Sequence, residues 1–308
     1  MIYRRTLRRE VGCTGIGLHS GRPVRLRLLP APAQHGIRFA RTDVGVEIPA
    51  TLAHVGEQDH ATTLSRDGVS IGTVEHLLAA LAGLGVDDAR VEVDGPEVPV
   101  LDGSAAPFVI LLHEAGLRPL AVPRLHIRIK EPVAVVHGGK SARLTPAEHF
   151  EIDYSIGFDH PLLRHQAFSV RVTPRSFTEQ VAPARTFGFL REVEMLRKSG
   201  LALGGSLENA VVIGETGVLN NKLRFEDEFV RHKILDAVGD LALLGHPLLG
   251  RLEATRAGHA LHAAVAQKLL ATPGACEIVA PERAPVVAVH ARDPESPLES
   301  PAYSLSTS

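Results

Sequence analysis

Cysteine is scarce in this chain: only two of 308 residues are cysteines, and Cys13 and Cys276 lie far apart in the sequence. They form no C-x-x-C pair, which argues against a disulfide scaffold, a thiolate zinc site and a dithiol redox motif. Any metal site must therefore take its ligands from the 16 histidines together with aspartates and glutamates.

Long apolar runs and an excess of charge are also missing. No segment approaches the roughly 18 consecutive apolar residues of a membrane-spanning helix, and Met1–Arg9 contains no apolar signal-peptide core. We therefore expect a cytoplasmic protein without a transmembrane segment. The 33 Lys and Arg residues nearly balance 35 Asp and Glu residues. Since nucleic-acid binding requires a basic surface, we expect no nucleic-acid partner.

What the chain does have is a strand-then-helix order that occurs twice. In the first half, Val24–Leu29 and Ile37–Arg41 alternate as strands do and apolar helices follow; the second half repeats this order. The repetition predicts an α+β fold of two similarly folded domains, each a β-sheet layered on helices, as after a pseudo-duplication. The expected domains are residues 1–121 and 124–290, with a linker at Leu120–Pro123.

Two stretches do not fit this repeat. Residues at about 188–222 are apolar but interrupted by glycines, as in Leu201–Gly205. Such a segment is typical of an insertion that lines an apolar pocket, and an additional core element explains the pattern equally well. Residues 291–308 are rich in proline and serine, which predicts a disordered tail.

The segment Phe225–Leu241 predicts an amphipathic helix with an unusual polar stripe. Residues four apart share a helix face, so His232, Asp236 and Asp240 lie above one another. A His and an Asp one turn apart can bind the same metal ion. The alternative is that the stripe is simply a solvated helix face. Because like carboxylates repel, a cationic partner is expected beside the two aspartates.

A second apolar helix begins near Thr73, its expected N-cap, and carries Glu75 and His76 in its first turn. Charged groups on a helix that otherwise looks buried need partners, and capping contacts or an ion pair would satisfy them structurally. Alternatively, His76 joins His232 and Asp236 to form three ligands of the kind that leave zinc an open fourth position.

The same arrangement indicates roles for three further residues. Zinc lowers the pKa of water toward about 7, and Glu75, next to a ligand, would accept the proton that this water loses. His259, which follows a glycine, is a candidate general acid. Asp240, one turn past Asp236, would fix the tautomer of His259 and favour its protonated form.

Six short motifs lie in a fixed order along the chain and extend from the N-terminus to about residue 262. They are Gly17–Gly21, Thr73–Leu77, Asp102–Phe108, Ala184–Phe189, Arg224–Asp240 and Gly258–Leu261. Each alone is unspecific, but together their order and spacing resemble the zinc-dependent UDP-3-O-acyl-N-acetylglucosamine deacetylases of lipid A biosynthesis.

The resemblance implies two similarly folded α+β domains, with an inserted element in the second that forms a passage for the acyl chain of the substrate. At the matching positions of this sequence, it implies that His76, His232 and Asp236 bind zinc (Zn2+). The insertion lies outside the motifs, so the resemblance leaves the shape of the passage undefined.

For the chemistry, the resemblance implies that Glu75 is the general base and that His259 is the general acid, supported by Asp240. Thr186 would help zinc to stabilise the oxyanion. The residues implied to contact the glucosamine and nearby groups are Phe187, Glu192 and Lys233.

The resulting hypothesis is hydrolysis of the 2-acetamido group of UDP-3-O-(3-hydroxyacyl)-N-acetylglucosamine to the amine and acetate. The expected enzyme is a monomer that contacts the membrane surface transiently. Two other classes fit the same residues. Two histidines and one carboxylate also form the facial triad of non-haem iron(II) oxygenases. A nucleotide-sugar or lipid binding module without catalysis would use the polar stripe structurally.

Overall fold

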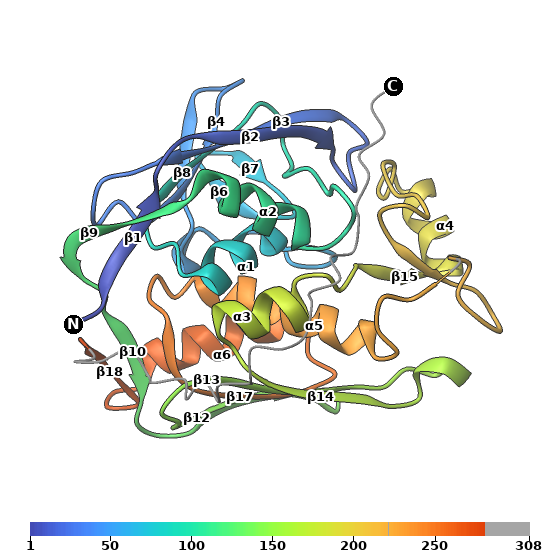
Figure 1. The fold of residues 1–308 in the computed structure, drawn as a ribbon. Helices are drawn as coiled ribbons and strands as arrows, with labels where there is room; N and C mark the ends of the chain where they lie inside the picture. The colour runs from blue at the N-terminus through green and yellow to red at the C-terminus, as the bar shows by residue number, and fades with distance from the viewer. Residues whose placement is uncertain (221, 281–308) are drawn as a thin grey trace, which may run out of the picture.

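The computed structural model describes residues 1–220 and 222–280 and contains both helices and sheets. Two β-sheets form the outer layers, and the main helices lie between them (Figure 1). The mixed class expected from the sequence is therefore confirmed. The predicted tail, residues 291–308, lies outside the described residues.

The first half of the chain forms one outer sheet and the helices that cover it. The strands of this half of the chain are β1 (Tyr3–Leu7), β2 (Val11–Ile16), β3 (Pro23–Pro30), β4 (Ile37–Arg41), β5 (Val46–Pro49), β6 (Leu64–Arg66), β7 (Val69–Ile71), β8 (Ala89–Val93) and β9 (Leu117–Pro123). Its helices are η1 (Leu52–His54), α1 (Glu75–Leu84) and α2 (Ala106–Ala115). The five-stranded sheet has the order β2-β3-β8-β4-β5.

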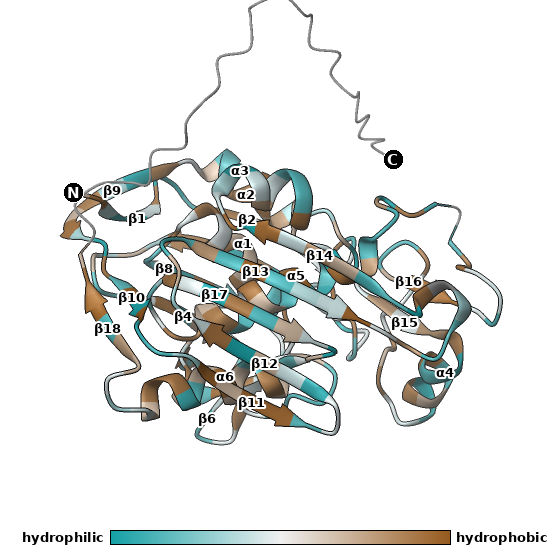
Figure 2. Ribbon diagram, turned by 90° about the horizontal axis from the view of Figure 1, so that it is seen from below, coloured by the Kyte–Doolittle hydropathy of each residue, from teal (hydrophilic) through white to brown (hydrophobic). Residues whose placement is uncertain are grey.

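The second half forms the other outer sheet. The strands of this half of the chain are β10 (His126–Ile129), β11 (Val133–His137), β12 (Lys140–Thr145), β13 (Phe150–Ile156), β14 (Gln166–Arg171), β15 (Phe187–Phe189), β16 (Val211–Ile213), β17 (Leu248–Thr255) and β18 (Cys276–Val279). Its helices are η2 (Pro161–Leu163), α3 (Pro174–Ser176), η3 (Phe177–Val181), α4 (Leu190–Lys198), α5 (Glu228–Ala242) and α6 (His259–Ala271). The sheet has seven strands, and Figure 2 looks onto it, with polar and apolar residues mixed along its strands.

The two sheets pair their strands in the same pattern. In the first sheet, β3 pairs antiparallel with β8 and β4 pairs parallel with β8. In the second sheet, β12 pairs antiparallel with β17 and β13 pairs parallel with β17. The outer neighbours also correspond, because β2–β3, β4–β5, β11–β12 and β13–β14 are all antiparallel.

Alternating hydrophobicity explains why the strands lie where they do. Along β3, the side chains of Val24, Leu26 and Leu28 are buried, whereas Arg25 between them is exposed. Successive side chains of a strand point to opposite faces, so this alternation places one face against the helices. The strand predictions for Val24–Leu29 and residues 37–41 are therefore confirmed.

Two local predictions near the helices are wrong. Thr73 is not a helix cap: α1 begins at Glu75, and Thr73 has a left-handed φ of 55°. Its hydroxyl instead donates a hydrogen bond of 2.8 Å to Glu97 Oε1. Leu120–Pro123, expected to be a linker, forms the end of β9, whose backbone pairs with β1. The pairing satisfies backbone groups that a free linker would leave to solvent.

The segment expected to be an insertion, at about residues 188–222, contains α4 and β16, and β15 lies at its start. The two strands pair in parallel with each other and form a sheet of their own. Both views place α4 and β15 to one side of the main layers (Figures 1 and 2). None of the residues of α4 is buried.

Helices α1 and α5 pack closely at the centre of the molecule, where the two halves meet (Figure 1). Gly239 of α5 lies directly against the backbone of Glu75, and a Cβ added at Gly239 would overlap the Glu75 carbonyl oxygen. Only a residue without a side chain permits this approach. The contact therefore sets the distance between the start of α1 and the polar stripe of α5.

We expect Gly239→Ala to lower the free energy of unfolding by about 1–3 kcal/mol, because the added methyl group must push α5 away from α1. Denaturant titration followed by circular dichroism measures this loss. Gly217→Ala is the matched control, since a Cβ there has nothing within 4 Å. Equal stability of the Gly239 variant and the control would contradict the inferred tight packing.

Candidate metal centre and its neighbours

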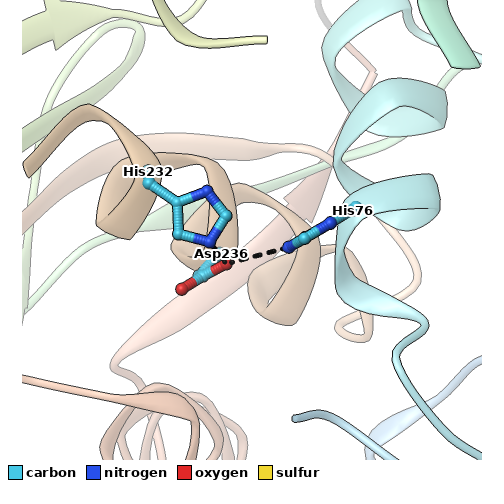
Figure 3. A group of neighbouring side chains, drawn as sticks. All are labelled: His76, His232 and Asp236. Carbon is cyan, nitrogen blue, oxygen red and sulfur yellow. Dashed lines mark ion pairs between the residues drawn. The ribbon is translucent and has the colours of Figure 1, made fainter. Parts of the chain in front are cut away.

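His76 of α1 and two residues of α5, His232 and Asp236, converge between the two halves (Figure 3). Asp236 Oδ1 lies 3.7 Å from His76 Nε2 and 3.3 Å from His232 Nε2. All three side chains are buried. The polar stripe predicted on α5 therefore faces the interior, and its interpretation as a solvated helix face is wrong.

These separations fit a metal ion better than direct hydrogen bonds. Zinc bonds of about 2.0–2.1 Å in a tetrahedron place neighbouring ligand atoms about 3.3 Å apart. Within the described part of the chain, Asp236 Oδ1 is buried and has no hydrogen-bond partner. A buried acceptor without a partner is costly. A cation between the three atoms would satisfy this acceptor, so the residues fit the metal that the sequence implied.

The protonation states of the cluster also suit a metal site. His232 Nδ1 donates to the carbonyl oxygen of Ala184 at 3.0 Å, which leaves the lone pair of Nε2 directed at the cluster. Burial lowers the pKa of His76 to about 3 and also lowers the pKa of His232. Both imidazoles are thus neutral, the form that binds metals. Lys233 Nζ, 2.8 Å from Asp236 Oδ2, is the cation expected beside the aspartates.

Glu75 precedes His76 at the start of α1 and is buried. Its Oε2 accepts a hydrogen bond of 3.0 Å from the backbone N–H of Thr62. Burial raises the pKa of the Glu75 carboxyl to about 7, against the opposing charge of His259. A carboxylate with a pKa near neutrality is suited to accept a proton during catalysis.

A second polar cluster lies one turn further along α5. Asp240 Oδ2 is 2.8 Å from His259 Nδ1 and 2.8 Å from His262 Nδ1. Both distances are ordinary for hydrogen bonds from an N–H group to a carboxylate, and both are shorter than the about 3.3 Å expected between two ligand atoms of one zinc ion. These three residues therefore fit a hydrogen-bonded group better than a metal site. Burial opposes a charged imidazole, but Asp240 outweighs this effect and raises the pKa of His259 to about 9. The imidazole of His259 is therefore protonated at neutral pH.

Three members of this network were not expected from the sequence: His262, Thr62 and Tyr154. His262 lies three residues after His259, so helical spacing alone could have placed both on one face. Its Nε2 is 3.0 Å from the buried Tyr154 hydroxyl. Thr62 and Tyr154 carry no sequence signal, because only tertiary packing brings their loop and strand to α5 and α6.

The residues implied to contact substrate line one cavity of about 510 Å³, next to the group formed by His76, His232 and Asp236. Phe187, Glu192 and Lys233 are all part of its wall. The Phe187 ring centroid lies 6.2 Å from that of His232 and 5.6 Å from Lys233 Nζ. Thr186 is held by backbone hydrogen bonds to Gly103 and Val211, both 2.8 Å long. The roles of these residues stay predictions.

Among residues 1–220 and 222–280, no helix combines the length and the apolar character needed to cross a bilayer.

The fold and the site define a mixed helix-and-sheet protein with a buried His–His–Asp cluster that could hold a metal ion. A family model described as UDP-3-O-acyl N-acetylglycosamine deacetylase matches residues 4–271. The chain belongs to this family.

Curated relatives agree with this assignment over most of the chain. A UDP-3-O-acyl-N-acetylglucosamine deacetylase of Myxococcus xanthus is 52% identical over 283 residues, which cover 91% of this chain and 90% of the relative. Proteins of the same name from Anaeromyxobacter dehalogenans and Pseudomonas entomophila are each 51% identical. Those alignments cover 90% and 91% of this chain, and 90% and 94% of the respective relatives.

Proposed function

We propose that this protein is a zinc-dependent amidase that removes the N-acetyl group from UDP-3-O-(3-hydroxyacyl)-N-acetylglucosamine and releases the amine and acetate. The names of its relatives support the substrate and the deacetylation. The observation that carries the proposal is the convergence of His76, His232 and Asp236, with the buried Glu75 preceding His76 at the start of α1.

In this proposal, His76, His232 and Asp236 hold the metal. A zinc ion with three protein ligands supplies Lewis-acid chemistry, since it polarises a carbonyl oxygen and makes water acidic enough to ionise near pH 7. Two neutral imidazoles and one carboxylate leave a net positive charge at such a site. This charge would favour negative charge that develops on the amide carbonyl oxygen.

Glu75 and His259 divide the proton transfers between them. Glu75 accepts the proton of the attacking water, which its pKa of about 7 allows at neutral pH. His259 donates a proton to the departing nitrogen through Nε2, because Nδ1 is engaged with Asp240. Asp240 therefore orients the imidazole and favours its protonated form.

The cavity beside the cluster supports binding of the sugar. Lys233, Phe187 and Glu192 contribute a cation, an aromatic ring and a carboxylate to its wall. We propose that they contact the glucosamine and nearby groups, and that Thr186 helps to stabilise the oxyanion. The neighbouring segment of α4, β15 and β16, within residues 188–222 and their flank, would form the passage for the acyl chain.

The cellular setting and the domain organisation are part of the same proposal. We infer that the protein acts in lipid A biosynthesis as a cytoplasmic monomer that contacts the membrane surface transiently. Exposed apolar side chains around α4 support such contact; they are Leu190, Met195, Leu203 and Leu207. The matching strand pairing of the two sheets supports two duplicated domains, residues 1–121 and 124–290.

Metal content and acetate release, measured on the same purified protein, test the proposal. We expect about one zinc per chain, acetate formed in proportion to amine, and loss of turnover on chelation with recovery on adding zinc. Bound iron with oxygen-dependent turnover would instead identify a non-haem iron enzyme. Metal-free protein that binds the nucleotide sugar but releases no acetate would identify a binding module.

A further inference from the structure

Thr62 is the one residue among those described that is hydrogen-bonded to both Glu75 and Asp240. It lies in the loop between η1 and β6 and is completely buried. Its backbone N–H donates to Glu75 Oε2 at 3.0 Å. Its Oγ1 lies 2.5 Å from Asp240 Oδ1. The side chain of Thr62 and its own amide thus connect the start of α1 to the last turn of α5.

The direction of the Thr62–Asp240 hydrogen bond follows from the charge of Asp240. Although burial opposes the charged form, the charge of His259 holds the pKa of Asp240 below its ordinary value. An ionised carboxylate only accepts hydrogen bonds, so the Thr62 hydroxyl must be the donor. A hydrogen bond with one charged partner and a separation of 2.5 Å belongs to the strong class.

This bond determines how the Asp240 carboxylate is rotated. Oδ2 receives the Nδ1–H groups of His259 and His262, while Oδ1 receives the hydroxyl of Thr62. Without the third donor, the carboxylate could turn about its Cβ–Cγ bond and carry the imidazole of His259 with it. Three donors from two separate segments, α6 and the loop that carries Thr62, fix one orientation.

The Thr62 backbone is in turn hydrogen-bonded to the start of α1. Besides the bond to Glu75, the carbonyl oxygen of Thr62 accepts the N–H of Val74 at 3.2 Å. The loop position therefore moves with the first turn of α1. Any displacement of Glu75 relative to Asp240 must stretch a bond made by Thr62.

We propose that Thr62 is a positioning residue that holds the proton acceptor Glu75 and the proton donor His259 in a fixed spatial relation, acting on His259 through Asp240. The role rests on the proposed function, because it presumes that these two groups transfer protons. Thr62 itself transfers no proton, since its hydroxyl hydrogen is engaged with Asp240.

Thr62→Val tests the proposal, because valine keeps the shape and the backbone N–H but lacks the hydroxyl. Loss of a hydrogen bond to a charged group should lower kcat about 10- to 100-fold. KM should change less than about twofold, since an interaction that acts in the transition state alters kcat rather than uniform binding. Zinc content and the unfolding midpoint are measured in parallel.

Two further variants separate positioning from a general structural effect. Thr62→Ser restores the hydroxyl and should recover most of the lost kcat. Thr51→Val removes a threonine hydroxyl that bonds to His54 Nδ1 at 2.8 Å outside the site, and it should leave kcat unchanged. An equal loss of kcat in the Val and Ser variants, or a loss that follows the zinc content, would overturn the proposal.

A double variant identifies the route of the effect. If Thr62 acts through Asp240, then Thr62→Val combined with Asp240→Asn should be no slower than Asp240→Asn alone, within about twofold. Fully additive losses would show that Thr62 acts in another way and would overturn the proposal.

An NMR measurement keeps this test separate from that of the proposed function. With labelled histidine, the Nδ1–H protons of His259 and His262 report their hydrogen bonds to Asp240 without any turnover. Thr62→Val should shift both signals, and Thr51→Val should shift neither.

If the wild-type protein releases no acetate, the proposed function fails, and the catalytic role of Thr62 fails with it. Unchanged signals in Thr62→Val would refute the positioning itself, whatever the activity.

Discussion

Glu75→Gln is expected to lower turnover about 10²–10⁴-fold, the typical loss when a positioned base is removed, while the protein keeps its zinc. The amide has nearly the same shape and can still accept the Thr62 N–H through its oxygen. It cannot take up a proton from water near neutral pH. Acetate release under saturating substrate, together with elemental analysis of the same sample, measures both quantities.

The selective loss distinguishes a catalytic carboxyl from a structural one. If Glu75 were only a buried capping or ion-pair residue, the Gln variant would lose stability and keep its turnover per folded chain. Glu179→Gln serves as a surface control, since Glu179 pairs with Arg175 in an exposed i,i+4 contact. Turnover of the Glu75 variant equal to that of this control would contradict the proposed mechanism.

His232→Ala is expected to abolish both zinc binding and acetate release. His232 Nε2 is one of three ligand atoms, and no other ligand atom is grouped with His76 and Asp236 among the described residues. Removal of a residue that only orients a metal ligand typically lowers the affinity for the metal by about 10–100-fold. Removal of the ligand His232 itself should lower the affinity for zinc by more than this. Elemental analysis after dialysis and a zinc titration of acetate release measure the two effects.

Circular dichroism must accompany that experiment, because His232 is buried and its removal leaves a cavity. His113→Ala provides the control, as His113 is exposed on α2. A folded His232 variant that still binds one zinc per chain would show that the metal lies elsewhere. Retained zinc would therefore refute the assignment of the site even if turnover were lost.

Much of the local structure could be predicted, because it depends on periodicity along the chain. The alternation in β3 and the four-residue spacing of His232, Asp236 and Asp240 follow from the geometry of strands and helices alone. Predictions from the local sequence pattern were wrong where a residue distant in the chain determines the conformation. Thr73 resembles a helix cap, but its hydroxyl binds Glu97, which lies on a different segment.

By itself, the sequence determined which side chains share a helix face and which ligand types a metal site could contain, because both depend on spacing and composition. Only the tertiary structure decided that the polar stripe of α5 faces inward and meets His76 on α1. The reason is packing: Gly239 lets the two helices approach at Glu75, and no local pattern encodes the distance between elements far apart in the chain. The same packing brings Thr62 to Asp240 across 178 residues.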